Sequence, residues 1–189
     1  MSDDECMIES YDNSRVIGNE IIYFGEISES NILDFLERFK RLENELLKKA
    51  LEHDGSKPTI KVIINSAGGD LFAGIAAMNI LEKSKVKIIT EAQGECCSAA
   101  TFLLLAGSER RMGESAFVLI HQIASGEFWG KFEELKNEFK CCSKLMSHIK
   151  DIYRSRTTIP DRMFKKMMKK DIYVNSKECI KYGIVHEIA

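Results

Sequence analysis

The stretch from Gly94 to Gly107 has the sequence Gly-Glu-Cys-Cys-Ser-Ala-Ala-Thr-Phe-Leu-Leu-Leu-Ala-Gly, and one hydrophobic pattern gives way to another within it. Before it, Lys87 to Ala92 is short and rich in isoleucine and threonine, which is typical of a strand. Inside it, Ala99 to Ala106 is continuously small or apolar, which predicts a buried helix. The sequence therefore predicts a strand, a turn and a helix, with Ser98 at the start of the helix.

A serine at a helix start can serve two purposes. The first backbone N–H groups of a helix have no partner within it, and the positive end of the helix dipole lies there, so an oxygen nucleophile that passes through anionic intermediates is stabilised. Serine is also among the residues preferred as a simple N-cap. From this stretch alone, Ser98 is either a candidate nucleophile or only a cap.

Length and composition limit the class of protein. The chain has 189 residues, 44% of them hydrophobic and 30% charged, with a formal net charge of -2, which fits one globular domain and offers no basic face for nucleic acid. No apolar run approaches the roughly 20 residues needed to span a bilayer, and the N-terminus is acidic where a signal peptide is basic. We expect a cytoplasmic protein with no membrane and no nucleic-acid partner.

Cysteine and histidine usage favours neither disulfides nor a metal. The six cysteines include two adjacent pairs, Cys96-Cys97 and Cys141-Cys142, but no Cys-x-x-Cys, and sequence neighbours do not easily form an unstrained disulfide. The four histidines show no ligand spacing with cysteine or carboxylate. We expect reduced thiols, no metal site and no cofactor.

The first half of the chain alternates strands and helices. Residues 1–19 are polar and predict a mobile N-terminal arm, followed by a domain over residues 20–189. The elements expected after the arm are a strand over 20–27, a long amphipathic helix from Ser28 or Ser30, a buried strand over 59–64 and a helix over 71–81. This alternation predicts an α/β fold with a largely parallel sheet. The Gly-Gly turn at 65–70 lacks the Gly-x-x-x-x-Gly-Lys pattern of a phosphate-binding loop.

The second half contains a helix that is long for so small a domain. A strand over 115–120 ends at His121, and a helix over 131–156 follows, about 38 Å long. We expect it to extend beyond the body and pack on another subunit, although a bent helix wrapping its own core is an alternative. A short helix over 160–170, a strand over 172–174 and a helix over 176–182 complete the chain.

Ser98, His121 and Asp171 are a candidate catalytic set. A hydroxyl nucleophile needs a base to accept its proton, and an imidazole needs a carboxylate to fix its tautomer. All three residues lie at ends of predicted elements. Their order differs from that of the α/β-hydrolases, and the Gly-x-Ser-x-Gly elbow is absent, which disfavours that fold.

Four separated motifs carry a resemblance to a known family. They are Asn65-Ser-Ala-Gly-Gly69, residues 94–107, Val118-Leu-Ile-His-Gln122 and Tyr182-Gly-Ile-Val185. In order and near spacing, they resemble the proteolytic subunit of the caseinolytic ATP-dependent protease, ClpP, over about Glu20 to Ile188. The resemblance implies a crotonase-like ββα spiral in which the helix 131–156 is a protruding handle that joins two seven-membered rings around an enclosed chamber.

The resemblance also implies roles for single residues. Ser98 matches the family's nucleophile, His121 its general base and Asp171 its orienting acid. Gly69 and Ala99 match the positions whose N–H groups form the oxyanion hole. The implied activity is a serine endopeptidase that hydrolyses unfolded polypeptides in a homo-oligomer fed by an AAA+ unfoldase.

The sequence departs from the family pattern at several positions, and other functions of the same fold remain open. Ala67 stands where the family usually has proline, Ala99-Ala100 where it has Met-Gly, and Lys170 where it has arginine. One alternative is a non-catalytic or regulatory ring subunit of the same fold, and another is an acyl-CoA hydratase or isomerase of the crotonase-like fold. Cys97 is an alternative thiol nucleophile, although it too would need His121 as its base.

Overall fold

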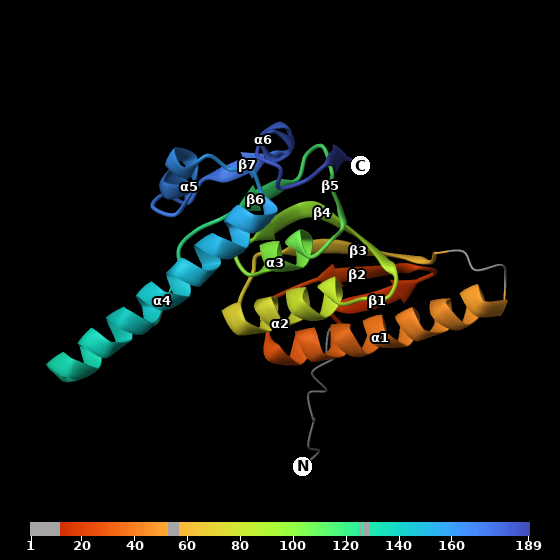
Figure 1. The fold of residues 1–189 in the computed structure, drawn as a ribbon, viewed down its shortest axis with the longest axis horizontal. Helices are drawn as coiled ribbons and strands as arrows, with labels where there is room; N and C mark the ends of the chain where they lie inside the picture. Colours follow the sequence, from red (N-terminus) through yellow and green to blue (C-terminus); the bar gives the residue numbers. More distant parts are fainter. Residues whose placement is uncertain (1–11, 53–56, 125, 127–128) are drawn as a thin grey trace, which may run out of the picture.

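The computed structural model describes residues 12–52, 57–124, 126 and 129–189. Within them the chain forms eight strands and six helices that alternate through its first half (Figure 1). In chain order they are β1 (Ser14–Ile17), β2 (Glu20–Phe24), α1 (Glu29–Glu52), β3 (Thr59–Ser66), α2 (Leu71–Glu82), β4 (Lys87–Cys97), α3 (Ala100–Leu105), β5 (Glu109–Met112), β6 (Phe117–Leu119), α4 (Phe132–Arg156), α5 (Asp161–Met167), β7 (Tyr173–Asn175), α6 (Ser176–Lys181) and β8 (Glu187–Ile188).

The strands form one largely parallel sheet, as the alternation of elements predicts. The main path runs β1-β2-β3-β4-β5-β8, and β6 joins β4 on one side and β7 on the other. Only the β1–β2 and β6–β7 pairs described here are antiparallel. Strand β4 pairs with β5 through residues 89–92 and with β6 through residues 95–97. The C-terminal end of β4 thus separates from β5 and pairs with β6. Ser98, which follows β4 directly, therefore lies beside β6.

The core lies between the sheet and the helices packed on it. Strand β3 alternates strictly, with Ile60, Val62 and Ile64 buried and their neighbours half-buried, because successive side chains of a strand point to opposite faces. Helix α1 contributes Phe35 and Phe39, both with no exposed surface. Burial of each such ring contributes about 1.5–3 kcal/mol to the free energy of unfolding.

The prediction of a mobile arm over residues 1–19 is wrong for residues 14–17, which form a strand. Ser14–Ile17 form β1, which pairs antiparallel with β2 through a tight turn at Gly18. Ser14 is buried and Val16 and Ile17 are exposed, so this edge strand is held by its backbone ladder instead of an apolar face, and a hydrophobic pattern does not identify it. The folded domain therefore includes these residues, and residues 1–11 of the arm lie outside the described part.

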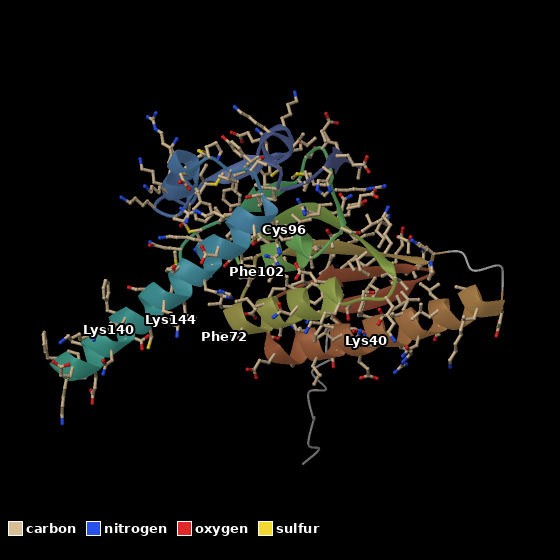
Figure 2. The ribbon with its side chains drawn as sticks, viewed as in Figure 1. Lys40, Phe72, Cys96, Phe102, Lys140 and Lys144 are labelled. Carbon is tan, nitrogen blue, oxygen red and sulfur yellow. The ribbon has the colours of Figure 1, made fainter. Side chains whose placement is uncertain are left out.

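Helix α4 extends well beyond the body, as the length of the predicted helix indicates. Figure 1 shows its N-terminal half projecting away from the other elements, and Figure 2 shows Lys140 and Lys144 on this projecting part. Its buried residues, Ile149, Ile152 and Tyr153, all lie in the C-terminal half. The alternative of a bent helix that wraps its own core is thus wrong.

Arg110 fixes the end of α4 to the sheet. From β5, its guanidinium donates to the carbonyl of Arg156 at the last turn of α4 (3.0 Å) and to the carbonyls of Gly183 (2.9 Å) and Ile184 (2.8 Å) near the C-terminus. Because three carbonyls from two segments share one side chain, α4 leaves the body at a defined place. No helix in the described ranges combines the length and apolarity that crossing a membrane requires.

Candidate active site

Ser98 occupies a strained turn between β4 and α3. Its φ is +52°, a region that non-glycine residues seldom adopt and that costs of order 1–3 kcal/mol. Three hydrogen bonds hold its backbone: its N–H donates to the carbonyl of Leu119 (2.8 Å), and its own carbonyl accepts from the N–H (3.0 Å) and the hydroxyl (2.6 Å) of Thr101. Such strain persists only where the surroundings enforce it.

The interpretation of Ser98 as a helix cap is wrong. Helix α3 begins at Ala100, and its N-cap residue is Ala99, which has no side chain able to cap. Ser98 therefore lies one residue before the cap, and its hydroxyl is not used to satisfy the helix. It is half-buried, which leaves the hydroxyl accessible from the adjoining cavity.

The Gly-Gly turn after β3 packs directly against the serine turn. A Cβ on Gly68 would lie 2.7 Å from both the carbonyl oxygen of Cys97 and the Cβ of Ser98. Because atoms do not approach so closely, only glycine lets the two turns meet. The Asn65-to-Gly69 motif and the 94–107 stretch, separate in sequence, thus form one structural unit.

Two backbone N–H groups are available beside Ser98. Gly69 forms a parallel bridge with Ile27, in which Ile27 donates to the Gly68 carbonyl (2.8 Å) and Asp70 donates to the Ile27 carbonyl (2.6 Å). In a parallel bridge the N–H of the central residue points away from the partner strand, so the Gly69 N–H faces the other side. Neither this N–H nor that of Ala99 donates to any group that the structure describes.

One cavity of about 430 Å³ brings together four of the five predicted site residues. Ser98, His121, Gly69 and Ala99 all line it. Its other lining residues include apolar side chains from three helices, namely Leu71, Phe72, Phe102, Leu145, Ile149 and Tyr153. A hydroxyl, an imidazole, two amide donors and an apolar pocket are the groups that an acyl-transfer site requires.

Asp171 does not line this cavity and is exposed. The antiparallel register of β6 and β7 pairs Leu119 with Tyr173, and the same register continued by two residues would place His121 opposite Asp171. Strand β6 in turn pairs with β4, and Leu119 accepts the hydrogen bond from Ser98. The three residues therefore flank neighbouring strands: Ser98 follows β4, His121 lies two residues after β6, and Asp171 lies two residues before β7. No hydrogen bond joins any two of them in the described structure.

The alternative nucleophile, Cys97, is poorly suited to that role. Burial, reinforced by the charge of Glu95, raises the pKa of the Cys97 thiol to about 11. The thiolate is the reactive form of cysteine, so Cys97 stays protonated and unreactive near pH 7. Among the described residues, no cluster of three or more His, Cys, Asp or Glu side chains is placed to hold a metal ion.

The sequence does not predict the polar side chains that lie behind Ser98 and along the cavity wall. The hydroxyl of Thr101 bonds both the Ser98 carbonyl and the hydroxyl of Tyr153, which is 52 residues away in sequence. Glu138 and Cys142 of α4 also reach the cavity, where the Cys142 thiol donates to the Glu138 carboxylate (3.5 Å). A threonine within the otherwise apolar stretch 99–106 is the only sequence signal for this layer.

Comparison with known proteins identifies the family. The family described as Clp protease matches residues 27–189, which is most of the chain. The chain belongs to the Clp protease family. The match covers every predicted site residue from Gly69 to Asp171, and it supports a serine-type peptidase in general, in agreement with the predicted enzyme class.

Individual Clp relatives resemble the chain over almost its full length. It is 29% identical over 184 residues to an ATP-dependent Clp protease proteolytic subunit of Deinococcus radiodurans, covering 95% of this chain and 85% of that protein. It is 30% identical over 192 residues to the ATP-dependent Clp protease proteolytic subunit 2 of Treponema denticola, covering 100% and 88%. A ClpP1 mutant structure from Listeria monocytogenes superposes with a TM-score of 0.76 at 23% identity over 90% of this chain and 91% of that one. The predicted ClpP-like fold is thereby confirmed.

Proposed function

We propose that this Clp family member is a serine endopeptidase that cleaves unfolded polypeptides, with Ser98 as nucleophile, His121 as general base and Asp171 as the acid that orients it. The observation that carries the proposal is the single cavity shared by Ser98, His121, Gly69 and Ala99. An extended peptide can enter this cavity with its carbonyl carbon at Ser98. The neighbouring apolar side chains from α2, α3 and α4 then accept a side chain of the substrate.

The reaction follows from these groups. The Ser98 Oγ attacks the peptide carbonyl carbon while His121 takes the hydroxyl proton, and the oxygen that gains charge is bound by the N–H groups of Gly69 and Ala99. His121 then gives the proton to the departing amine as the C–N bond breaks. Water, deprotonated by His121, attacks the resulting ester and releases the acid product and free Ser98.

The proposal requires Asp171 to move toward His121. Both residues extend from paired strands in matching register, so a short extension of the β6–β7 ladder would bring them together. Catalytic hydrogen bonds are often long or poorly aligned in a free enzyme and tighten when substrate binds. Completion of the triad in the assembled, substrate-bound enzyme is therefore part of the proposal.

The active form is proposed to be a homo-oligomer of two stacked seven-membered rings. Phe132, Leu135 and Phe139 lie on the projecting half of α4 and are exposed in the single chain. Such a set of large apolar side chains on one helix is suited to contact with another subunit. Stacked rings would enclose the cavities and admit only unfolded chains.

A separate ATPase of the AAA+ unfoldase class is the proposed partner. The two bacterial relatives are named as proteolytic subunits of an ATP-dependent protease. This sequence has no phosphate-binding Gly-x-x-x-x-Gly-Lys motif, so a different chain would use the ATP. A cytoplasmic location, where unfolded chains and ATP are both present, completes the proposal.

The test is labelling of Ser98 combined with native mass spectrometry. The wild-type protein should form a ring and take one fluorophosphonate adduct per subunit, at Ser98. Ser98→Ala should take no adduct and lose peptidase activity by about 10⁴-fold or more, as removal of a serine nucleophile does elsewhere. Cys97→Ala is the matched control, and it should keep both the adduct and the activity.

The alternatives give different results. A ring that forms but takes no adduct and cleaves no peptide would favour the non-catalytic ring subunit, and it would contradict the proposal. Activity that persists in Ser98→Ala but disappears in Cys97→Ala would assign the reaction to the thiol. A hydratase or isomerase would act on acyl-CoA and leave peptides intact.

A further inference from the structure

A chain of hydroxyl groups links helix α4 to the backbone of Ser98. The Tyr153 hydroxyl lies 2.5 Å from the Thr101 Oγ1, and the Thr101 hydroxyl donates to the Ser98 carbonyl at 2.6 Å. Thr101 has no exposed surface and Tyr153 is also buried, so water does not compete for these bonds. The tyrosine is in the last turn of α4, Thr101 is in the first turn of α3, and Ser98 lies in the turn between β4 and α3.

The direction of these hydrogen bonds is determined by counting protons. A carbonyl only accepts, so the one hydroxyl proton of Thr101 is committed to Ser98. Tyr153 must therefore donate its own proton to Thr101 Oγ1. Burial raises the pKa of Tyr153 well above its usual range, so it keeps this proton at any working pH. The Tyr153 hydroxyl therefore donates to the Thr101 hydroxyl, which in turn donates to the Ser98 carbonyl.

Tyr153 is itself held in a fixed position. Its ring packs against Phe102 of α3 (centroids 5.8 Å apart) and against Phe164 of α5 (5.6 Å). The hydroxyl at the end of the ring thus has a fixed place relative to α3. A displacement of α4 along its axis would break the contact with Thr101, because a hydrogen bond weakens steeply with distance and angle.

We propose that Tyr153 and Thr101 are positioning residues, which hold Ser98 in its strained reactive turn and couple that turn to α4. This inference rests on the proposed function, because it assigns these residues to the reaction of Ser98. The Ser98 carbonyl receives two hydrogen bonds, and both come from Thr101. Loss of the hydroxyl removes one of the three hydrogen bonds that hold this strained backbone and leaves the Ser98 carbonyl with the Thr101 N–H alone.

Four variants test the coupling. Tyr153→Phe keeps the ring packing and removes the donor, Thr101→Val keeps the shape and removes the hydroxyl, and the double variant removes both. Thr101→Ser restores the hydroxyl and is the rescue. We expect each single loss to lower kcat by about tenfold, since small displacements of a reacting group have effects of this size or larger, with KM changed less than about twofold.

The double variant should lose no more kcat than the worse single variant, because both changes break the same chain. Its melting temperature should exceed that of Thr101→Val. That single variant leaves a buried tyrosine hydroxyl without an acceptor, whereas the double variant removes the unpaired group. Thr101→Ser should recover most of kcat.

Thr90→Val is the matched control. Thr90 is also wholly buried, and its hydroxyl also donates to a carbonyl, that of Leu104 (2.7 Å), at the other end of α3. We expect this variant to lose stability as Thr101→Val does while keeping kcat and the rate of fluorophosphonate labelling.

Two results would overturn the inference. If Tyr153→Phe and Thr101→Val lower the melting temperature but leave kcat unchanged, the hydroxyls are structural only. If their losses of kcat multiply in the double variant, they do not act as one chain. Failure of the proposed function is distinct, because the wild-type protein would then show neither labelling nor peptidase activity.

Discussion

The two glycines of the turn after β3 are required for different reasons, and Gly69 gives the sharper test. Its φ is +146°, and a Cβ there would lie 2.2 Å from the carbonyl oxygen of Ile27. Gly69→Ala must therefore push apart the bridge to Ile27, which fixes the direction of the Gly69 N–H that we propose as an oxyanion donor. We expect kcat/KM for a peptide to fall by about 10²–10³-fold, the usual effect of losing one oxyanion donor. Steady-state kinetics on folded, assembled protein measures this.

Gly18→Ala is the control for backbone strain. Gly18 also has a positive φ, +61°, but no atom lies within 4 Å of a Cβ built on it. This variant should lose about 1 kcal/mol of stability and retain activity, because the turn between β1 and β2 contains no site residue. Equal losses of activity in the two variants would mean that the Gly69 N–H has no special role.

At the residue scale, the sequence predicts those site residues that belong to a recognisable local motif. Ser98, His121, Gly69 and Ala99 were predicted in this way, and they share a cavity. The contact between Thr101 and Tyr153 was not predictable, because it depends on how α3 packs against α4 and joins residues from unrelated stretches. The strained φ of Ser98 is likewise a consequence of packing, since nothing in the local sequence demands it.

At the scale of elements, strands with apolar patterns were predicted and polar ones were missed. Strand β5 (Glu109–Met112) has the sequence Glu-Arg-Arg-Met, and its ladder and charge pairs hold it in place: Glu109 pairs with Lys87 (2.5 Å) and Arg111 with Glu187 (2.6 Å). Strand β8 has only two residues and exists because β5 offers it a backbone edge. Strand β4 continues past Gly94 to Cys97 because β6 supplies a new partner, which a local pattern does not reveal.

Glu43 provides the test at this scale, because it ties α1 to the loop between α2 and β4. This buried carboxylate accepts from the hydroxyl of Ser84 (2.6 Å) and the N–H of Lys85 (2.7 Å), and it pairs with Lys40 (2.7 Å). Burial alone would raise its pKa, but these hydrogen bonds and the nearby lysine lower the pKa overall. A depressed pKa stabilises the fold above the unfolded value of about 4.3, and the gain is lost as pH falls through the folded pKa.

Glu43→Gln should therefore destabilise the protein by about 1–3 kcal/mol at pH 7, and the difference from wild type should shrink below pH 4. Thermal unfolding measured from pH 3 to 7 checks this. Glu37→Gln is the control: Glu37 is on the same helix, but its pair with Arg41 is exposed, so we expect a change below about 0.5 kcal/mol at every pH. A Glu43→Gln deficit that persists unchanged at pH 3 would show that the lost stability is not that of the ionised group.

At the scale of the whole molecule, α4 serves both the site and the surface. Its C-terminal half closes the cavity with Ile149 and Tyr153, and Arg110 fixes its last turn. Its N-terminal half projects from the body (Figure 1), holds none of the helix's buried residues, and carries Phe132 and Phe139, which are exposed in the single chain. The exposed half and the buried half belong to one continuous helix, and the buried half holds Tyr153, which contacts Thr101 beside Ser98. Assembly through α4 would therefore act directly on the residues around Ser98.

Phe139→Glu tests that link between assembly and activity. Phe139 is 73% exposed on the projecting half of α4, so the substitution costs the folded monomer little. In an assembly that covers this half, each subunit would lose about 2 kcal/mol of apolar burial and gain a charge that is costly to bury. We expect native mass spectrometry to show smaller species, with a loss of peptidase activity that is restored at high protein concentration.

Leu51→Glu, which places the same charge on an 88% exposed residue of α1, should leave both the assembly and the activity intact. If Phe139→Glu assembles as wild type does, the projecting half of α4 is not the contact between subunits, and another surface must join them.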